Sequence, residues 1–388
     1  MTRLAGATVV LPDRLLSPGQ IVVQDGRIIE VSASSGRAAG ARDLAGHYIV
    51  PGFIDVHVHG VEGIDALDGG DAVSRISARL PRFGVTAFCP TSVACPPREL
   101  KELLRGVRSA REAAVPSSAR VLPAHLESNF INADFRGAQP HACIRAPNEA
   151  PEGAFSGRNI LDEIDAARPD VAIVTVAPEI DGVLALIPEL VRHGYRVSLG
   201  HSGATYEQAR AAILAGASQA THLFNRMTPL AHRAPGLAGA VLESGDVAAE
   251  IICDGVHVHP AVVRAAVAAK GLSKVMAITD GTAGSGLPRG ARATLGGRPI
   301  TTGDAAYLDD GTLAGSVLTM DGAFRMLVTV MGFSLIDAAQ MCATTPAREL
   351  ALHGHGVLAP GAIADFVVLD ADLQVVETYL AGQPAGVS

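Results

Sequence analysis

The sequence contains no apolar run that approaches the roughly 20 residues required for a membrane-spanning helix. Arg3, Asp13 and Arg14 interrupt the first 16 residues, so this segment does not read as a secretory signal peptide. Basic residues form no run, and the net charge of the 388 residues is −8. We therefore expect neither nucleic acid nor an anionic membrane surface as a partner.

Cysteine is also scarce, and its spacing excludes common cysteine motifs. The five cysteines are odd in number and include no Cys-x-x-Cys pair: Cys89, Cys95, Cys143, Cys253 and Cys342. This pattern favours reduced, mostly buried thiols in a cytoplasmic protein. Because 48% of the residues are hydrophobic, the chain can bury a large core.

From Tyr48 onward, short β-rich runs alternate with longer helical segments, which is the pattern of consecutive βαβ units. Eight such runs are found, at residues 49–59, 86–92, 121–128, 172–179, 196–202, 219–225, 249–257 and 275–282. Eight units predict an α/β fold with a (β/α)8 TIM barrel. An open, doubly wound sheet is the alternative, but it would need a glycine-rich phosphate-binding fingerprint near the first run, and none is present.

Both ends of the chain are β-rich. Asp25-Gly26 marks a hairpin between residues 20–24 and 27–32, and residues 364–369 and 375–381 also read as strands. We predict that residues 1–50 and 345–388 pack together as a small β-sandwich and that residues 51–344 form the barrel.

The first β-rich run ends in His57 and His59. Alternate side chains of a strand point to the same face, so the two imidazoles would lie together and could bind a divalent metal ion. Two ordinary polar residues at a strand end would give the same pattern, so the pair alone does not decide.

Other runs end in residues of the same chemistry. In TIM-barrel enzymes the catalytic residues sit at the carboxyl ends of the strands, so these side chains should converge at one mouth. Imidazoles and carboxylates suit Zn²⁺, Fe²⁺ and similar ions. Six residues could bind two metal ions, with Glu127 bridging them: His57, His59, Glu127, His201, His222 and Asp280.

Such a metal lowers the pKa of bound water to about 7 and makes hydroxide available near neutral pH. Asp280 would take the proton of that water and later pass it to a leaving group. The alternative for Asp280 is an N-cap of a following helix, but the glycine-rich residues 281–286 indicate a loop.

With these motifs, the sequence resembles the N-acetylglucosamine-6-phosphate deacetylases of the amidohydrolase superfamily. The resemblance covers about residues 48–370, with the motifs in the family's order, and the blocks at 221–225 and 311–316 are specific to this family. It rests on residues 51–60, 125–127, 200–205, 221–225, 232–236, 254–257, 279–280 and 311–316. It implies a (β/α)8 barrel with a β-sandwich built from both termini. It also implies hydrolysis of N-acetylglucosamine-6-phosphate to glucosamine-6-phosphate and acetate.

The resemblance also implies roles for single residues. Glu127, His201 and His222 match the family's principal metal ligands, and Asp280 matches its acid/base. Some members lack the two histidines of the first strand and use one metal ion. This chain has both histidines and so resembles the members that bind two metal ions.

Three further residues match substrate contacts of the family. Asn225 and His257 match contacts to the sugar. Arg233 matches the arginine that reaches the sugar phosphate, often across a dimer interface, which implies a homodimer. For Arg233, an exposed salt-bridging residue is the alternative.

The chain departs from the family in the expected substrate pocket. The usual Gly-Pro after the glutamate is replaced by Ser128-Asn129, and a histidine that helps polarise the acetyl carbonyl is replaced by Gln139. Either Gln139 donates a hydrogen bond in its place, or His141 takes the role. Arg226 stands where the family usually has alanine. These changes leave the hydrolytic chemistry intact and leave the substrate open.

Three alternatives to this function exist, two of them enzymes and one not. The first is an amidohydrolase that acts on a different anionic N-acyl substrate, for which Arg226 would be a new contact. The second is a relative of dihydroorotase, which generally bridges its metals with a carboxylated lysine on the fourth strand, but residues 172–179 contain no lysine. The third is a barrel that lost catalysis and serves as a scaffold, but such proteins typically lose ligands, and every ligand is present here.

Overall fold

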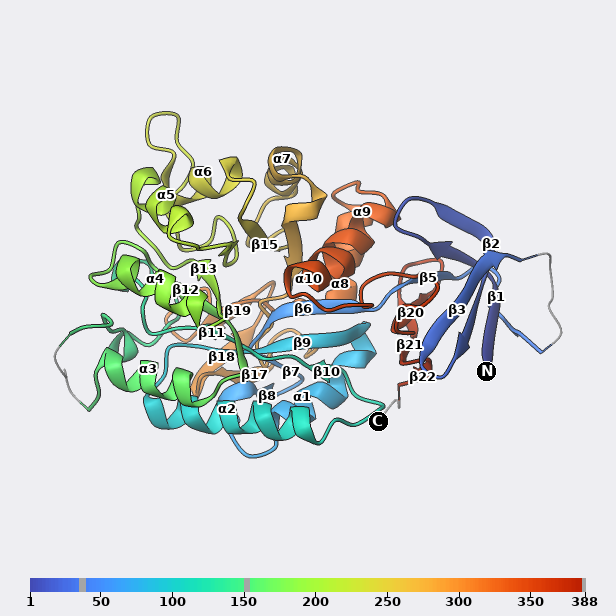
Figure 1. Ribbon diagram of the computed structural model, residues 1–388, viewed down its shortest axis with the longest axis horizontal. Coiled ribbons are helices and arrows are strands. Elements are labelled where there is room, and N and C mark those ends of the chain that lie inside the picture. Colours follow the sequence, from blue (N-terminus) through green and yellow to red (C-terminus); the bar gives the residue numbers. More distant parts are fainter. Residues whose placement is uncertain (35–39, 150–153, 386–388) are drawn as a thin grey trace.

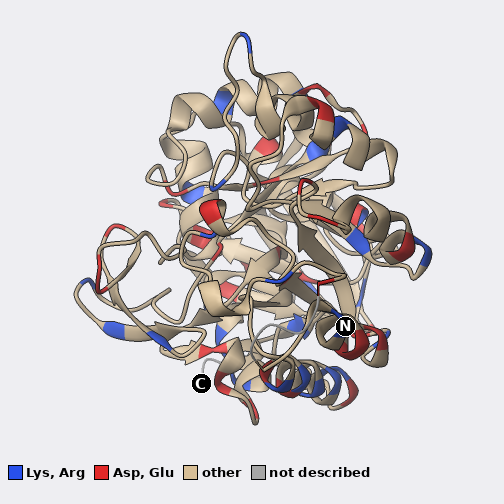
Figure 2. Cartoon of the chain, turned by 90° about the vertical axis from the view of Figure 1, so that its left-hand side faces the viewer, with Lys and Arg blue, Asp and Glu red and all other residues tan. Residues whose placement is uncertain are grey.

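The computed structural model describes residues 1–34, 40–149 and 154–385. Figure 1 shows a barrel surrounded by helices and, beside it, a smaller sheet built from both ends of the chain. None of the described helices is long and apolar enough to cross a membrane. Figure 2 shows basic and acidic residues interspersed over the outer helices of one side, without a large area of one sign.

Eight strands, all parallel and paired in chain order, form the barrel. They are β6 (Phe53–Val58), β9 (Val85–Ser92), β11 (Ala124–Glu127), β12 (Val171–Val176), β13 (Arg196–Leu199), β14 (Gln219–Ala220), β15 (Ala248–Ile252) and β16 (Val275–Ile278). A short strand, β10 (Arg120–Val121), also pairs with β9. A bridge between Val58 and Gly281 closes the barrel. Every residue of β6, β9, β11 and β16 is buried, as expected for parallel strands covered on both faces. The predicted (β/α)8 barrel is confirmed.

Strand β6 is irregular immediately before the predicted metal ligands. Asp55 pairs with Phe88 of β9, whereas Val58 pairs with Pro90, so three steps along β6 face two steps along β9. An extra residue of this kind bends a strand and re-aims the side chain next to it. The extra residue lies beside His57.

The helices are α1 (Ala72–Arg79), α2 (Pro97–Glu112), α3 (Gly157–Ala166), α4 (Val183–Arg192), α5 (Tyr206–Leu214), α6 (Gly236–Glu243), α7 (Pro260–Lys270), α8 (Met320–Thr329), α9 (Leu335–Ala339) and α10 (Thr345–Glu349). Helix α2 shows why the sequence predicts them, because Leu100, Leu103, Leu104 and Val107 form one buried stripe at helical spacing. Helix α6 contains two glycines, which weaken its helical signal in the sequence.

Two small sheets lie beside the barrel strands. β7 (Gly60–Val61) and β8 (Ile64–Asp65) form a short ribbon directly after β6. After β16, an antiparallel sheet of β17 (Arg292–Leu295), β18 (Arg298–Thr302) and β19 (Ala306–Leu308) precedes α8.

The two ends of the chain form one eight-stranded sheet of β1 (Thr2–Val10), β2 (Leu15–Gln24), β3 (Arg27–Ala33), β4 (Arg42–Asp43), β5 (Tyr48–Pro51), β20 (Phe366–Leu369), β21 (Val375–Leu380) and β22 (Gln383–Pro384). The predicted turn at Asp25-Gly26 joins β2 to β3. The sheet curls, since Arg27 forms a bridge with Ile363 just before β20, and it encloses its own hydrophobic core. Helix α10 contacts β6 and β16, so residues 345–349 lie with the barrel, and the boundary falls later than residue 345.

All five cysteines are buried and free, as the sequence predicts. Burial raises the pKa of Cys89 and of Cys342 well above that of an ordinary thiol. Such thiols are poor nucleophiles, so none of them is a candidate catalytic group.

Candidate active site

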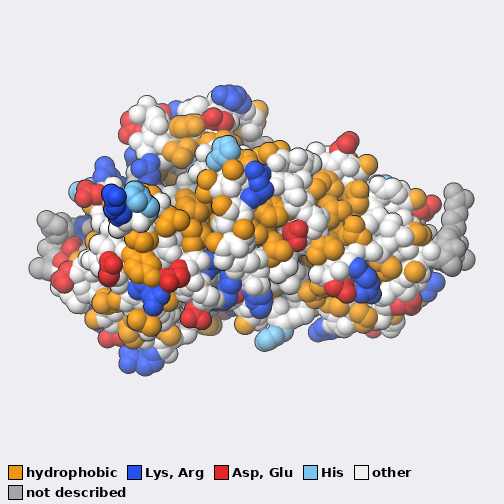
Figure 3. Space-filling view, turned by 90° about the horizontal axis from the view of Figure 1, so that it is seen from above, with side chains coloured by type: hydrophobic (Ala, Val, Ile, Leu, Met, Phe, Trp, Pro, Cys, Tyr) orange, Lys and Arg blue, Asp and Glu red, His pale blue; other side chains and the backbone are white. Residues whose placement is uncertain are grey.

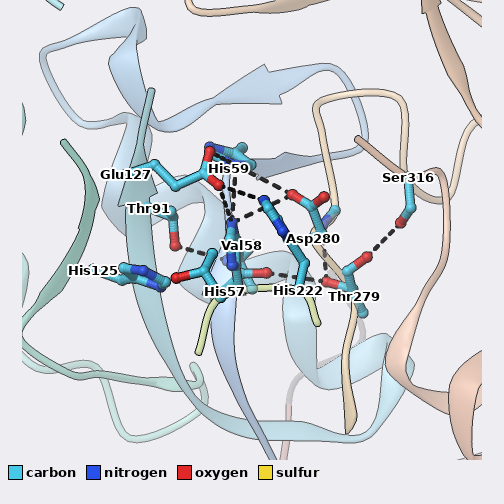
Figure 4. A network of polar contacts seen from close by, with 12 residues as sticks. His57, Val58, His59, Thr91, His125, Glu127, His222, Thr279, Asp280 and Ser316 are labelled. Carbon is cyan, nitrogen blue, oxygen red and sulfur yellow. Dashed lines mark hydrogen bonds and ion pairs between the residues drawn. The ribbon is translucent and has the colours of Figure 1, made fainter. Parts of the chain in front are cut away.

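The first and last strands of the barrel bring three ligand-type side chains together. His57 lies near the end of β6, His59 follows that strand, and Asp280 follows β16. Nε2 of His57 lies 3.2 Å from Nε2 of His59, and Oδ1 of Asp280 lies 3.3 Å from each of these nitrogens. We call this triangle of atoms the His57 site. Figure 4 shows the three side chains converging.

A second triangle, which we call the Glu127 site, lies next to it. Glu127 ends β11, and His201 and His222 follow β13 and β14. Oε1 of Glu127 lies 2.9 Å from Nε2 of each histidine, and these two nitrogens are 3.1 Å apart. The other oxygen, Oε2, lies 3.5 Å from Nε2 of His59, so the carboxylate stands between the two sites.

Three of these residues have an unusual backbone conformation. The φ angles of His201, His222 and Asp280 are 47°, 33° and 48°. A residue with a Cβ rarely adopts this left-handed region, and such strain persists where the surrounding structure imposes it, commonly at functional sites. Each residue directly follows, or lies just beyond, a barrel strand, so the turn directs its side chain into the mouth.

The hydrogen bonds of the rings define where their protons lie. Nδ1 of His201 lies 2.9 Å from the carbonyl oxygen of Phe135, and Nδ1 of His57 lies 2.9 Å from Oε2 of Glu250. Both partners can only accept, so in each neutral ring Nδ1 carries the proton and Nε2 carries a lone pair. These lone pairs face the carboxylates of Glu127 and Asp280. Lone pair against lone pair is repulsive unless a cation lies between them.

The pKa shifts indicate the same demand for positive charge. Burial alone would lower the pKa of His57, but the neighbouring carboxylates, led by Asp280, outweigh it and raise the pKa to about 10. The pKa of His222 is also raised, because the contact with Glu127 outweighs burial. Burial would raise the pKa of Glu127, but the adjacent histidines hold it well below its usual range.

The residues also fit divalent metal ions in geometry and charge. Metal–nitrogen bonds of about 2.0–2.1 Å in a tetrahedral site place ligand atoms about 3.3–3.4 Å apart, close to the spacing in both triangles. Four buried carboxylates belong to this region, and none of them forms an ion pair with Lys or Arg within the described ranges: Asp55, Glu127, Glu250 and Asp280. Buried charges need partners. Two divalent cations would balance four carboxylates.

A cavity opens directly above the two sites. Besides the metal-type residues, it is lined by Gln139, Asn225, Arg226, His257 and apolar side chains that include Val93, Leu295 and Leu313. Nδ1 of His257 lies 2.6 Å from Oδ2 of Asp254, which fixes the proton on Nδ1 and leaves Nε2 able to accept a hydrogen bond. The amide nitrogen of Asn225 donates to the carbonyl of His222 at 3.2 Å.

The structure distinguishes Gln139 from His141. Gln139 is buried in the cavity wall, where its Oε1 accepts from the backbone N–H of Ala94 at 2.7 Å and its Nε2 donates to Oε2 of Glu127. His141 begins the short turn His141–Cys143, is exposed, and does not line the cavity. The placement therefore does not favour His141 as a group beside the substrate.

The two predicted arginines lie in different places. Arg226 is exposed at the cavity rim, and its side chain lies across Gly137, where a Cβ would come within 2.9 Å of Nε of Arg226. Arg233 is exposed on the hairpin closed by the bridge between Ala231 and Ala234, and it does not line this chain's own cavity. The loop between β14 and α6 forms the tall hairpin at the top of Figure 1.

Two of the sequence changes do not fall in the substrate pocket, contrary to expectation. Oγ of Ser128 donates to the carbonyl of Thr175, and Nδ2 of Asn129 donates to the carbonyls of Cys95 and Cys143 at 2.8 and 2.7 Å. Both side chains are buried and satisfied by backbone groups outside the cavity lining. Their hydrogen bonds hold backbone segments together, and neither side chain lines the cavity.

Sequence analysis missed two buried acids of the site, Glu250 and Asp55. Glu250 contacts His57, and Asp55 accepts from Oγ1 of Thr279 at 2.6 Å. Burial raises the pKa of Asp55 to about 6 against these hydrogen bonds. The available signal was a charged residue in an otherwise apolar strand, since β15 reads Ala-Ala-Glu-Ile-Ile.

Comparisons with known proteins agree with this geometry. The family described as "Amidohydrolase family" matches residues 48–385. The N-acetylglucosamine-6-phosphate deacetylase of Rattus norvegicus is 36% identical over 98% of this chain and 93% of its own length. The N-acetylgalactosamine-6-phosphate deacetylase of Escherichia coli O157:H7 is 35% identical over 87% of both chains.

A solved structure agrees along the whole chain. It is an aspartate-to-alanine variant of the N-acetyl-D-glucosamine-6-phosphate deacetylase of Mycobacterium smegmatis, in complex with N-acetyl-D-glucosamine-6-phosphate. It has a TM-score of 0.89 and 35% identity and covers 99% of both chains.

Proposed function

The chain belongs to the amidohydrolase family and, within it, to the N-acetylglucosamine-6-phosphate deacetylases, and on that premise we propose its reaction. It is a metal-dependent hydrolase that cleaves the amide of N-acetylglucosamine-6-phosphate with water. The products are glucosamine-6-phosphate and acetate. The observation that carries this function is the pair of buried triangles at the mouth of the barrel, where imidazole lone pairs and carboxylates face one another and require cations.

Each chain would hold two divalent ions, Zn²⁺ or Fe²⁺, one in the His57 site and one in the Glu127 site, with Glu127 between them. The spacing of Oε2 of Glu127 from His59, 3.5 Å, supports a shared carboxylate. When bound, such ions polarise the amide carbonyl and lower the pKa of water to about 7.

Asp280 supplies the proton transfers. Its Oδ1 belongs to the His57 site, and the residue lines the cavity, so it would reach a water placed beside the amide carbon. Asp280 accepts a proton from the attacking water and then donates it to the amide nitrogen as the C–N bond breaks. The amine leaves neutral, and the second proton of the water stays on the acetic acid, which ionises to acetate as it leaves the site.

The cavity wall would orient the substrate. Oε1 of Gln139 is fixed by Ala94, so its amide group keeps one N–H on Glu127 and directs the other into the cavity, where it can donate to the acetyl carbonyl. Asn225 and His257 also line the cavity and would contact the sugar. Arg226 at the rim would contact the phosphate.

Arg233 supports a homodimer in which each subunit completes the other's site. It is on a hairpin and does not line its own cavity, and Leu230 on the same loop is 56% exposed. Figure 3 shows broad areas of hydrophobic side chains between scattered charges on the face that carries α6 and α7. In the dimer, Arg233 reaches the phosphate in the partner's cavity. The buried, unpaired thiols support a cytoplasmic location.

One specific observation keeps a second substrate open. The exposed Arg226 adds a cation at the rim, and a galactosamine-6-phosphate deacetylase is nearly as similar to this chain as the glucosamine enzymes. The sugar epimer, or another anionic N-acyl compound, is therefore the point to test.

A substrate panel tests the proposed function. Protein treated with chelator and reloaded with Zn²⁺ or Fe²⁺ is assayed for acetate release. The substrates are N-acetylglucosamine-6-phosphate, N-acetylgalactosamine-6-phosphate and unphosphorylated N-acetylglucosamine. We expect activity only after metal loading, and the highest kcat/KM for N-acetylglucosamine-6-phosphate. Absence of acetate from all three would overturn the function, and preference for the galactosamine compound would change the assigned sugar.

Metal analysis tests the two-ion site. Elemental analysis of the loaded protein should approach two ions per chain, and His57→Ala should retain one. A wild type that stays at one ion after loading, with the same content in His57→Ala, would reduce the site to a single metal.

A further inference from the structure

A fully buried carboxylate lies directly behind the first histidine of the His57 site. Glu250 is in the middle of β15, and its Oε2 accepts a hydrogen bond from Nδ1 of His57 at 2.9 Å. This contact fixes the tautomer of His57, because a carboxylate can only accept. It also fixes the rotation of the ring, so that the lone pair of Nε2 faces Asp280.

The other three histidines of the two sites have no such support. His201 donates its Nδ1 proton to a backbone carbonyl. Nδ1 of His59 and Nδ1 of His222 have no hydrogen-bond partner within the part of the chain that the structure describes. Among the four histidines of the two sites, only His57 has a carboxylate behind it in the described residues. His57 belongs to the His57 site, so this support points to a role for one metal ion and not for both.

Glu250 is itself held in place from the other side. Its Oε1 accepts from Nε2 of Gln219, and Oε1 of Gln219 accepts from Nε of Arg196 at 2.6 Å, which keeps the Gln219 amide from turning over. The backbone N–H of His222 donates to Oε2 of Glu250 at 3.4 Å. These neighbours are all donors. A neutral amide at position 250 would place an N–H group against one of them, whichever way it turned.

We propose that Glu250 is a positioning residue that holds His57 for the metal ion of the His57 site and leaves the ion of the Glu127 site unaffected. This inference rests on the two-ion site of the proposed function. A carboxylate behind a metal-binding histidine typically changes metal affinity about 10- to 100-fold. Removal of the Glu250 carboxylate should therefore lower the affinity for one of the two ions by that factor.

The first experiment is a Zn²⁺ titration against a competing chelator, with wild type and Glu250→Gln. The wild type should bind two ions. The variant should bind one ion with unchanged affinity and the other about 10- to 100-fold more weakly. The matched control is Asp170→Asn, which also removes a buried carboxylate. Asp170 contacts Arg108 and Arg111 just before β12, at the opposite end of the barrel strands, so this control should leave both affinities unchanged.

A second variant separates positioning from the buried charge. In the exchange variant Gln219→Glu with Glu250→Gln, the charge moves next to Arg196, and the amide at position 250 can donate to position 219 and accept from His57. All hydrogen bonds are satisfied, so this variant should fold even if Glu250→Gln alone does not. Because His57 again has an acceptor, we expect the affinity for the weakly bound ion to recover at least about tenfold. If the single variant is unfolded, the exchange variant should instead bind two ions.

The outcomes are distinct. Unchanged affinities in Glu250→Gln, equal loss of both ions, the same loss in Asp170→Asn, or no recovery in the exchange variant would each overturn the positioning role. A wild type that binds only one ion contradicts the two-ion site of the proposed function instead, and this is seen before any variant is made.

Discussion

Nε2 of His59 and Oδ1 of Asp280 lie 3.3 Å apart, so the first and last strands of the barrel meet through two ligand-type side chains. The backbone reinforces this contact, because the N–H groups of His59 and Gly60 both donate to the carbonyl of Gly281, at 2.8 and 2.9 Å. The contacts that close the barrel therefore also hold this part of the site together. Asp280 cannot move without disturbing the seam between β6 and β16.

The role of Asp280 in proton transfer predicts a large effect of a conservative change. Asp280→Asn keeps an oxygen ligand and the size of the side chain but cannot accept the proton of water. We expect turnover to fall by at least about 100-fold while the metal content stays the same. Steady-state kinetics with parallel elemental analysis measure both quantities. Turnover like that of the wild type would mean that another group is the base.

Arg233 should act on phosphate binding. A bidentate guanidinium contact to a phosphate in a partly desolvated pocket predicts that Arg233→Ala loses about 2–4 kcal/mol of transition-state binding free energy, measured from kcat/KM. The loss should appear mainly as a raised KM for the phosphorylated sugar, with little change for the unphosphorylated one. If the residue works across subunits, mixed dimers of Arg233→Ala with Asp280→Asn should regain one working site. No regain would place Arg233 in its own subunit's cavity.

Arg226 should report on substrate identity. If it contacts the phosphate of N-acetylglucosamine-6-phosphate, Arg226→Ala raises the KM for that sugar. If it instead clashes with the sugar, the same variant gains activity on it, and the native substrate is a different anionic N-acyl compound. Kinetics on the glucosamine and galactosamine substrates, with wild type and variant side by side, decide between the two.

Glu349 pairs with Arg196 and Lys274 at the amino-terminal ends of β13 and β16, and it should stabilise the protein in a pH-dependent way. Burial would raise its pKa, but Arg196 and Lys274 outweigh burial and hold the pKa below 4.5. A carboxyl with a depressed folded-state pKa stabilises fully above its unfolded pKa and loses that contribution as the pH falls through the folded value. Glu349→Gln should therefore lower the free energy of unfolding by about 2 kcal/mol at pH 7.

Denaturant unfolding of wild type and Glu349→Gln from pH 7 downward measures this difference. The two proteins should converge in stability well below pH 4.5. A constant difference at all pH values would mean that packing, not charge, accounts for the loss.

The local pattern of the sequence was sufficient to predict the barrel strands and the meeting of the ligand-type residues at one mouth. Strand periodicity predicted that His57 and His59 share a face, and they lie 3.2 Å apart. The alternation of β-rich and helical segments predicted the barrel, because the hydrophobic period of each strand or helix can be read from its own residues, without the rest of the chain. Once the barrel is known, residues at the ends of its strands must meet at one mouth, which brings Glu127, His201 and His222 together.

Contacts between distant strands were decided only by the tertiary structure. Glu250 contacts His57 across 193 positions of sequence, and nothing within β15 indicates which neighbour its carboxylate meets. Gln139 and His141 are two residues apart, yet one faces the cavity and the other faces solvent, because an irregular loop has no period from which to read a face. Local sequence sets which side of an element a residue occupies, whereas register and packing between elements set what that side contacts.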